Sequence, residues 1–467
     1  TAVTEEVIAG FKFDSVAHSL GGLSARIVRD LALGRHGLEI EEADPAVFTP
    51  LPDGGGLTMW RDPAKTVEEI RRFSKADAEK WPAFCKQMAK LTRFIGALHS
   101  TTPPRITETT PDTLMTLAKL GLHLKGMGDK DMVEAIRTLP MPIAELLDDW
   151  FECDVLKGTL GAAGITGLMQ GPRGGGTAYA FLHHNVGNAA GVFRSARFAR
   201  GGMGRLAAAV ASAAKARGVE IRTGTVVSRV IVRDGRAAGV AASTGEEFGA
   251  GVIASAADPR RTFFDLLDVA SLDPQFIRQI KNIRFRGAVA KVNLALGEAP
   301  KLPARLISIS PSLDYLERAY DDAKYWAVSR QPYLEAAVSN GANGKSALSV
   351  WVQYVPYGAK GTQRKLKELV GTRVVGVLSE YAPEIEGTIE GMQVITPQNL
   401  ETDYGLSEGA IYHGELALDQ FFFMRPAPGW AQYRTPLVGL YLCGAGAHPG
   451  GGAMGAAGRN AAREILR

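Results

Sequence analysis

The spacing of apolar side chains changes along this chain, from a helical period in the middle to the alternation of strands further on. Between residues 62 and 161 apolar residues recur every three or four positions, which is the period of an amphipathic helix. The clearest set follows Ser74, a candidate N-cap, and consists of Trp81, Phe84, Met88, Leu91 and Ile95. The middle of the chain is therefore predicted to be mostly α-helical, with further helices over 111–127, 129–138 and 142–161.

Strands are predicted where apolar residues alternate or run together between glycine and proline turns. The strands predicted in this way cover 46–49, 57–60, 219–223, 225–233, 236–242, 247–254, 288–296, 347–355, 392–396 and 437–443. A helix over 205–217 feeds the third of them and then a three-stranded meander, an order typical of flavoproteins with two dinucleotide-binding domains. Together with the helical middle region, this order predicts an α/β or α+β fold.

Length and composition narrow the class of protein. A chain of 467 residues with 46% hydrophobic and 22% charged residues is typical of a globular protein with two or three domains. The formal net charge is only +4 and no long basic block occurs, so a nucleic-acid partner is not expected. The three cysteines lie far apart, which predicts neither disulfides nor a metal site. This cysteine usage indicates a reducing compartment: the cytoplasm, or the mitochondrion if the source is eukaryotic.

One predicted helix is unusually apolar. Residues 114–124 are apolar over most of the helix circumference, with interruptions only at Lys119 and His123. The segment is too short to span a membrane. Two interpretations remain open: a core helix of an α-helical domain, or a helix that contacts a membrane surface without crossing it.

Near its end the chain has a strand, a glycine-rich loop and a helix in direct succession. The strand over 437–443 is followed by a loop that begins at Gly444 and by a helix from Ala456. Glycines let a ligand approach the main chain, and a helix N-terminus stabilises negative charge. The third glycine of a dinucleotide-binding fingerprint would fall at Pro449, so this loop is not a first phosphate-binding loop.

Several segments carry a resemblance to one family. The loop 444–456, the central segments 201–204, 220–227 and 254–259, and the opening segments 1–6 and 10–14 resemble the phytoene desaturase (carotene desaturase and isomerase) family of FAD-dependent oxidoreductases. Residues 44–50, 182–184 and 186–187 are similar to one subgroup, the proteins called pyridine nucleotide-disulphide oxidoreductase domain-containing protein 2. The resemblance extends over essentially the whole chain. It implies a two-dinucleotide-binding-domain flavoprotein with a mixed-sheet substrate domain and a helical insertion.

The resemblance also implies roles for individual residues around FAD. The backbone near Val227 would meet the adenine, and the loop from Gly444 through Ala445 to Gly446 would approach the ribityl and pyrophosphate groups. His448 would orient the same loop. The N-terminus of the last helix would face the flavin N1/C2=O region, where reduced flavin carries negative charge. The residues of this last group are Met454, Gly455 and Ala456.

Polar residues outside the loop allow alternatives. His183 and His184 are either proton-transfer or substrate-orienting groups at the flavin, or a pair in which one is hydrogen-bonded structurally and the other exposed. Arg194 and Arg197 are predicted to be solvated at the surface. Cys443, on a buried strand, is interpreted as an inert apolar side chain rather than a flavin attachment point.

The family's opening strand–Gly-x-Gly-x-x-Gly–helix–strand unit, which binds the FAD pyrophosphate, has no counterpart in the printed sequence. At least about 30 residues would be needed to supply it. We expect such residues to exist outside this sequence, because the missing strands would lie in the middle of a parallel sheet. Their loss would expose apolar surface on strands such as 437–443.

The function that follows is hydride transfer between FAD and an apolar, isoprenoid- or polyene-like small molecule, in a reaction of the dehydrogenase, desaturase or isomerase type. One alternative is an amine-oxidase-like flavoenzyme, whose aromatic pair would come from Tyr412, Phe421, Phe422 and Tyr433. Another is a flavin-free scaffold or interaction protein, and self-association is compatible with each. The domains expected are an FAD-binding part (1–60, 195–285 and 425–467), a helical cap (61–194) and a substrate-binding mixed α/β domain (286–424).

Overall fold

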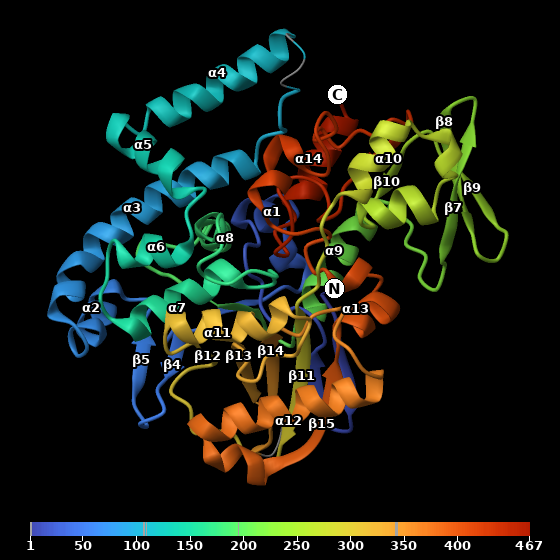
Figure 1. The fold of residues 1–467 in the computed structure, drawn as a ribbon. Helices are drawn as coiled ribbons and strands as arrows, with labels where there is room; N and C mark the ends of the chain where they lie inside the picture. The colour runs from blue at the N-terminus through green and yellow to red at the C-terminus, as the bar shows by residue number, and fades with distance from the viewer. Residues whose placement is uncertain (1, 106–107, 109, 195, 341–343) are drawn as a thin grey trace.

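The computed structural model describes residues 2–105, 108, 110–194, 196–340 and 344–467 (Figure 1). A seven-stranded sheet forms its lower part, a group of helices lies beside the sheet, and a smaller part with short parallel strands contains the C-terminus. Each of the three parts is built from more than one segment of the chain. Residues far apart in the sequence therefore meet where the three parts join.

The large sheet is mixed, and its strand order is β15-β11-β14-β13-β12-β4-β5. All neighbouring strands are antiparallel except β12 and β4, which run parallel. In chain order the strands are β4 (Val47–Pro50), β5 (Gly56–Met59), β11 (Val289–Leu296), β12 (Leu306–Ile309), β13 (Leu334–Asn340), β14 (Ser346–Gln353) and β15 (Ile389–Ile395). Residues 47–59 thus belong to this sheet, although the sequence pattern places them in the FAD-binding part; the domain division itself stays a prediction.

Side chains alternate between the two faces of this sheet, and the two faces differ in chemistry. On one face Val292, Leu294 and Val350 pack against α12 (Gln363–Tyr381), whose Val370 and Val374 are fully buried. The intervening residues of β11, β13 and β14 point to the other face and include a lysine, a glutamate and a tryptophan. That second face forms one wall of the candidate site.

The helical part packs against the edge of the sheet that carries β5. Its helices are α2 (Pro63–Arg71), α3 (Lys75–His99), α4 (Pro111–Lys125), α5 (Asp129–Thr138), α6 (Ile143–Asp148), α7 (Asp154–Ile165) and α8 (Thr177–His184). The Ser74 side chain caps α3 by accepting the N–H of Asp77, as predicted, and the five apolar residues predicted for one face of α3 are buried. A further helix, α11 (Leu313–Lys324), lies beside α7.

The third part holds the meander β7 (Val227–Arg233), β8 (Arg236–Ala242) and β9 (Glu247–Gly249), and a parallel pair, β10 (Ile253–Ser255) with β16 (Leu440–Leu442). Around them lie the hairpin β1 (Thr4–Ile8) and β2 (Phe11–Asp14), the pair β3 (Ile40–Glu42) and β6 (Arg197–Ala199), and four helices. The helices are α1 (Ala25–Asp30), α9 (Gly204–Lys215), α10 (Pro274–Lys281) and α14 (Ala456–Ile465). Helix α13 (Pro397–Tyr404) connects this part to the sheet.

Two predicted elements are divided in the structure. The helix predicted over 142–161 is two helices, α6 and α7, because the buried Asp77 carboxylate of α3 accepts the N–H groups of Glu152 and Cys153 between them. The strand predicted over 247–254 leaves the meander after Gly249 and continues as β10 beside β16.

One predicted strand does not form. Residues 219–223 are irregular, with Val219 and Ile221 exposed, because no strand in the described part of the chain lies beside them to pair with their backbone groups. In the segment 437–443, Val438 is 50% exposed, whereas Leu440 and Leu442 are buried against the meander and α14. Further exposed valines lie in the irregular segment and just before β10.

Among the described residues, none of the helices combines the length and the apolar character that crossing a bilayer requires.

Candidate functional site

A cavity of about 700 Å³ lies where the three parts of the molecule meet. Its lining comes from the glycine-rich loop after β16, from the end of α8, from the loop after β2 and from the polar face of the large sheet. Its volume is within the range of small-molecule and cofactor sites. It is the candidate active site and is called the main cavity.

The glycine-rich loop presents mostly main-chain atoms to this cavity. A Cβ on Gly444 would lie 2.3 Å from the carbonyl oxygen of Ala256, so only glycine permits the close approach of this loop to the segment after β10. Gly450 and Gly452 have φ angles of 111° and 115°, which other residues rarely adopt. The loop conformation thus depends on glycine at several positions.

The N-terminus of α14 faces the cavity. Its N-cap, Gly455, has a φ of 69° and offers no side-chain cap, and Ala456, Ala457 and Gly458 line the cavity. The first N–H groups of a helix have no intrahelical acceptor and carry the positive end of the helix dipole. A main-chain cradle that ends in such a helix fits the electron-rich flavin ring of FAD.

Both predicted histidines line the cavity, and both are held by hydrogen bonds. His183 Nε2 donates to the Gly451 carbonyl at 3.0 Å, and burial lowers the pKa of His183 to about 3, so this imidazole is neutral. His184 Nδ1 donates to the Ala163 carbonyl at 2.7 Å, and its Nε2 lies 2.9 Å from the Tyr412 hydroxyl. The interpretation that one of the two is exposed is wrong. His183 positions the glycine loop, whereas His184 and Tyr412 form a polar pair in the cavity wall.

The other predicted residues divide into two groups. Gly444, Ala445, Met454, Gly455 and Ala456 line the cavity, and so does Cys443. Burial raises the pKa of the Cys443 thiol. His448 is fully buried behind the loop, where its Nε2 donates to the Leu98 carbonyl at 2.9 Å. Gly446 packs against Pro259, and Val227 lies partly exposed at the start of β7, so neither lines the cavity. The cofactor roles of all these residues stay predictions.

A buried ionic network forms the cavity wall on the side of the sheet. Lys291 Nζ donates to His18 Nδ1 at 2.8 Å, and His18 Nε2 donates to Glu335 Oε1 at 3.0 Å. The second Glu335 oxygen accepts from Arg194 Nη2 at 2.5 Å and from the Tyr333 hydroxyl at 3.1 Å. A lysine on β11 and a glutamate on β13 are thereby joined through a histidine from the loop after β2.

Burial and neighbouring charges set the protonation of this network. Burial lowers the pKa of Lys291 to about 7 and, together with the Lys291 charge, lowers that of His18. Burial alone would raise the pKa of Glu335, but the Arg194 guanidinium and the hydrogen bonds from His18 and Tyr333 outweigh it and lower this pKa. Glu335 is therefore an ionised carboxylate whose charge is already compensated.

The sequence did not reveal this network, and one prediction about it is wrong. Arg194 is buried against Glu335 rather than solvated, and Arg197 donates two hydrogen bonds, to the carbonyls of Gly21 and Leu23. One signal was available: Lys291 is the one charged residue of a strand that is otherwise apolar except for Asn293, and a lysine is rarely buried without a partner. Its partners lie far away in the sequence, so no local pattern identified them.

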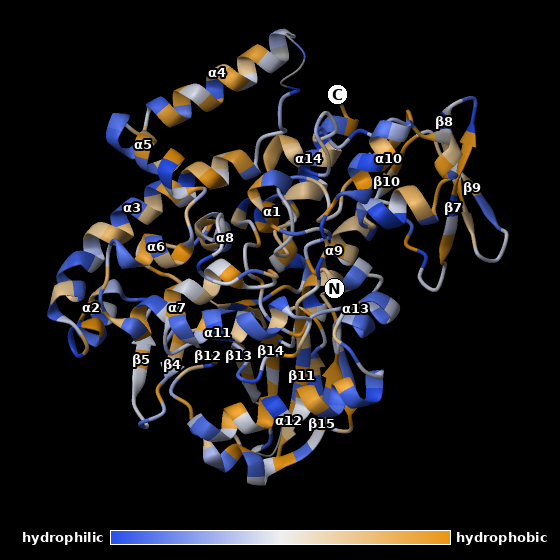
Figure 2. Ribbon diagram, viewed as in Figure 1, coloured by the Kyte–Doolittle hydropathy of each residue, from blue (hydrophilic) through white to orange (hydrophobic). Residues whose placement is uncertain are grey.

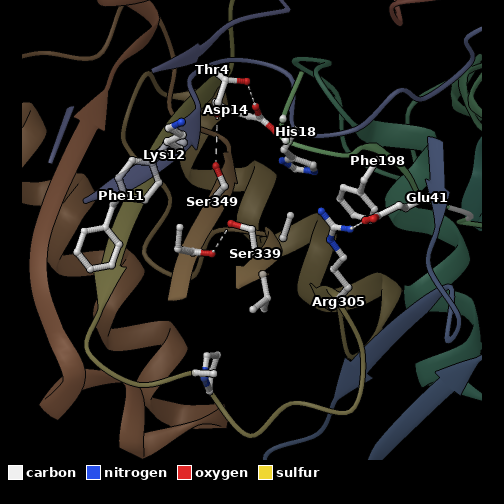
Figure 3. Close-up of a pocket in the computed structure, with 18 of the residues that line it drawn as sticks. Thr4, Phe11, Lys12, Asp14, His18, Glu41, Phe198, Arg305, Ser339 and Ser349 are labelled. Atoms are coloured by element: carbon white, nitrogen blue, oxygen red, sulfur yellow. Dashed lines mark hydrogen bonds and ion pairs between the residues drawn. The ribbon is translucent and has the colours of Figure 1, made fainter. Parts of the chain in front are cut away.

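A second cavity of about 760 Å³ lies beside the first, between the β1–β2 hairpin and the same face of the sheet (Figure 3). His18 lines both cavities. Figure 3 shows Ser339 and Ser349 on its floor and Arg305, which forms an ion pair with Glu41, on one side. Along β13 and β14, the residues on this face line first one cavity and then the other. The two cavities therefore follow one continuous sheet surface.

With this geometry in place, comparisons with known proteins define the class. Residues 180–466 match the model of the family described as flavin containing amine oxidoreductase. Because the match spans more than half of the chain, the protein belongs to this family. The prediction of an FAD-dependent oxidoreductase is thereby confirmed.

Individual relatives are similar over the whole chain or a large part of it. Pyridine nucleotide-disulfide oxidoreductase domain-containing protein 2 of Rattus norvegicus is 34% identical, over all of this chain and 87% of the relative. One component of the limonene dehydrogenase of Castellaniella defragrans is 22% identical, with the same two coverages. 4,4'-Diapophytoene desaturase of a Methylomonas species is 26% identical over 54% of this chain and 50% of its own length. The resemblance to the desaturase family and its subgroup is confirmed.

The fold also occurs in solved structures. An oxidoreductase from Methanosarcina mazei superposes with a TM-score of 0.58 at 16% identity, over 98% of this chain and 89% of that protein. At this identity the likeness concerns the fold alone. It confirms the predicted α/β or α+β fold with a mixed-sheet domain.

Proposed function

We propose that this flavin-dependent oxidoreductase acts on an uncharged, apolar molecule of the isoprenoid or polyene type, by removal or addition of hydride at a carbon atom. One observation carries the proposal. Of the described residues that line the main cavity, Glu335 is the only carboxylate, and Arg194 and His18 already bind both of its oxygens. A cationic substrate would have no counter-charge there, whereas an uncharged one needs none.

The chain's own residues then have distinct tasks. Val16, Leu306, Leu406 and Ile411 supply apolar surface that binds the substrate and excludes water. The proton lost or gained at the substrate carbon is relayed by the Tyr412 hydroxyl, which passes its own proton to Nε2 of the neutral His184 or takes it back. FAD, when bound along the glycine loop, supplies the two-electron chemistry.

An amine substrate is the second candidate, because the chain belongs to a family named for amine oxidoreductases. Of the four aromatic residues considered for a flavin-facing pair, Tyr412 lines the cavity. Phe421 and Phe422 pack against His448 instead, and the Tyr433 hydroxyl donates to the His448 carbonyl. This arrangement supports an apolar substrate over an amine, as do the names of the limonene and diapophytoene enzymes.

The test is anaerobic reduction of the FAD-loaded protein. Limonene or a linear polyene should bleach the visible absorbance of the oxidised flavin, whereas putrescine should not. Ile411→Trp, which fills the cavity, should slow bleaching at least about tenfold, whereas Leu369→Trp on the exposed face of α12 should leave the rate unchanged.

Two results would overturn the proposal. Bleaching by putrescine and not by either hydrocarbon would favour the amine-oxidase alternative. A purified protein that is colourless and takes up no added FAD would favour the flavin-free scaffold.

A further inference from the structure

The helices α4 and α5 form an arm that projects from the body of the molecule (Figure 1). Leu120 and Leu124 of α4 turn inward and pack against the helical core. The opposite side of α4 carries Leu114 and Leu122, which are 53% and 68% exposed, and Met115 is similarly exposed. Large apolar residues therefore occupy the side of α4 opposite its inward leucines. Figure 2 shows hydrophobic residues interspersed along this projecting helix.

Helix geometry places these residues on one continuous strip. Leu114, Ala118 and Leu122 are spaced by four, so they lie above one another on the outward face, with Met115 beside them. A surface helix of a globular protein normally has polar residues on that face. Helix α5, which contacts α4, adds two further exposed apolar residues, Val133 and Ile136, the latter 61% exposed. We call these five large residues and Ala118 the apolar strip.

Three exposed lysines lie beside the apolar strip. Lys119 and Lys125 on α4 and Lys130 at the start of α5 are exposed, and none of the three has an ion-pair partner among the described residues. Of the acidic groups of α5, Asp131 and Glu134 already contact Lys90 and Arg137, and Asp129 is exposed beside Lys130. An apolar strip flanked by unpaired lysines matches the boundary between acyl chains and anionic headgroups of a bilayer.

We propose that the α4–α5 arm binds the surface of membranes that contain anionic lipid, with the apolar strip inserted among the acyl chains and the three lysines at the headgroups. The alternative occupant, a second copy of this chain, would bring the same strip together with itself in a symmetric contact. That contact would set the three lysines against their own copies, and one helix face is small beside the area that a stable dimer buries. The proposal is independent of the substrate proposed above.

The test is sedimentation of the full chain with vesicles of phosphatidylcholine and phosphatidylglycerol in a three-to-one ratio (about 25% anionic lipid). Leu114→Gln, Met115→Gln and Leu122→Gln combined should lower partitioning at least about tenfold, because each change removes apolar surface from the bilayer. Lys119→Gln with Lys125→Gln should abolish the preference for these vesicles over pure phosphatidylcholine. A matched control is Val210→Gln, Leu369→Gln and Leu466→Gln, three exposed apolar residues on other faces, and it should partition as the unaltered protein does.

Circular dichroism establishes that each variant is folded, and light scattering without vesicles measures its mass. Equal partitioning of the α4 variant and the control variant would overturn the proposal, as would no partitioning of the unaltered protein. A dimer that the α4 changes convert to a monomer, without any change in vesicle binding, would assign the strip to self-association and also overturn it.

Discussion

At the residue scale, the feature of most chemical consequence is the buried series Lys291–His18–Glu335. Lys291 belongs to β11, which has a neighbouring strand on each side, and it is 2% exposed. The charges that face it are those of Glu335 and Asp14, with the Trp351 ring 5.8 Å away. Such a group is costly to bury in its charged form, which is the reason that its pKa falls.

This lowered pKa predicts a pH-dependent stability. Between about pH 7 and the ordinary lysine value of 10.5, the unfolded chain holds a proton on Lys291 that the folded protein does not. The folded state therefore gains stability as pH rises through this window, by up to about 1.4 kcal/mol per pH unit. Urea unfolding across this window should show that the free energy of unfolding of the natural protein rises with pH relative to that of Lys291→Met. A constant difference would show that Lys291 titrates normally, and Lys345→Met, at the exposed pair with Glu390, serves as the control.

At the element scale, the strand–loop–helix unit at the C-terminus depends on backbone approach. The parallel pair β10 and β16 brings the segment after each strand close to the other, and Gly444 sits at the closest point. Because the atom that a Cβ would meet is a carbonyl oxygen of the main chain, no side-chain rotation can relieve the contact.

Gly444→Ala should accordingly destabilise the protein by about 2 kcal/mol or more and weaken FAD binding, since the loop must move. Urea unfolding and a fluorescence titration with FAD measure the two effects. The matched change Gly376→Ala lies on the exposed side of α12, where a Cβ meets nothing, and should stabilise by about 0.5–1 kcal/mol. Equal effects of the two substitutions would show that the close approach does not constrain position 444.

At the scale of the whole molecule, one buried arginine joins the cavity wall to the glycine loop. The Arg425 guanidinium donates to the carbonyls of Tyr412, Gly414, Glu415 and Gln420, and also to that of Ala445 in the loop. None of these acceptors is charged, and burial lowers the pKa of Arg425 to about 10. The guanidinium thus holds the segment that carries Tyr412 against the segment that carries the glycines.

Arg425→Lys should cost about 2–4 kcal/mol, because three ammonium protons cannot satisfy five buried carbonyls in these directions. The same variant should bind FAD more weakly, since the loop loses its support. Thermal unfolding and FAD titration test both, with Arg330→Lys at the exposed pair with Asp322 as the control, for which the expected change is below about 0.5 kcal/mol. A variant as stable as the natural protein would contradict this role.

The sequence by itself determined the features that depend on neighbours in the chain. The apolar period predicted the buried face of α3, and the C-terminal strand, loop and helix were located from the sequence. Most of the predicted site residues line the main cavity for the same reason, since most belong to that one continuous unit. Local sterics and hydrogen bonds decide such features, so a short window contains the information.

Only the tertiary structure decided the features that need a distant partner. The Asp77 carboxylate divides the helix predicted over 142–161, and residues 219–223 remain irregular where no strand of the described chain lies beside them. Lys291, His18 and Glu335 are separated by up to 317 positions and meet because two strands of one sheet and a crossing loop bring them together. Burial then sets their pKa values, and burial is a property of the packed molecule that no sequence window contains.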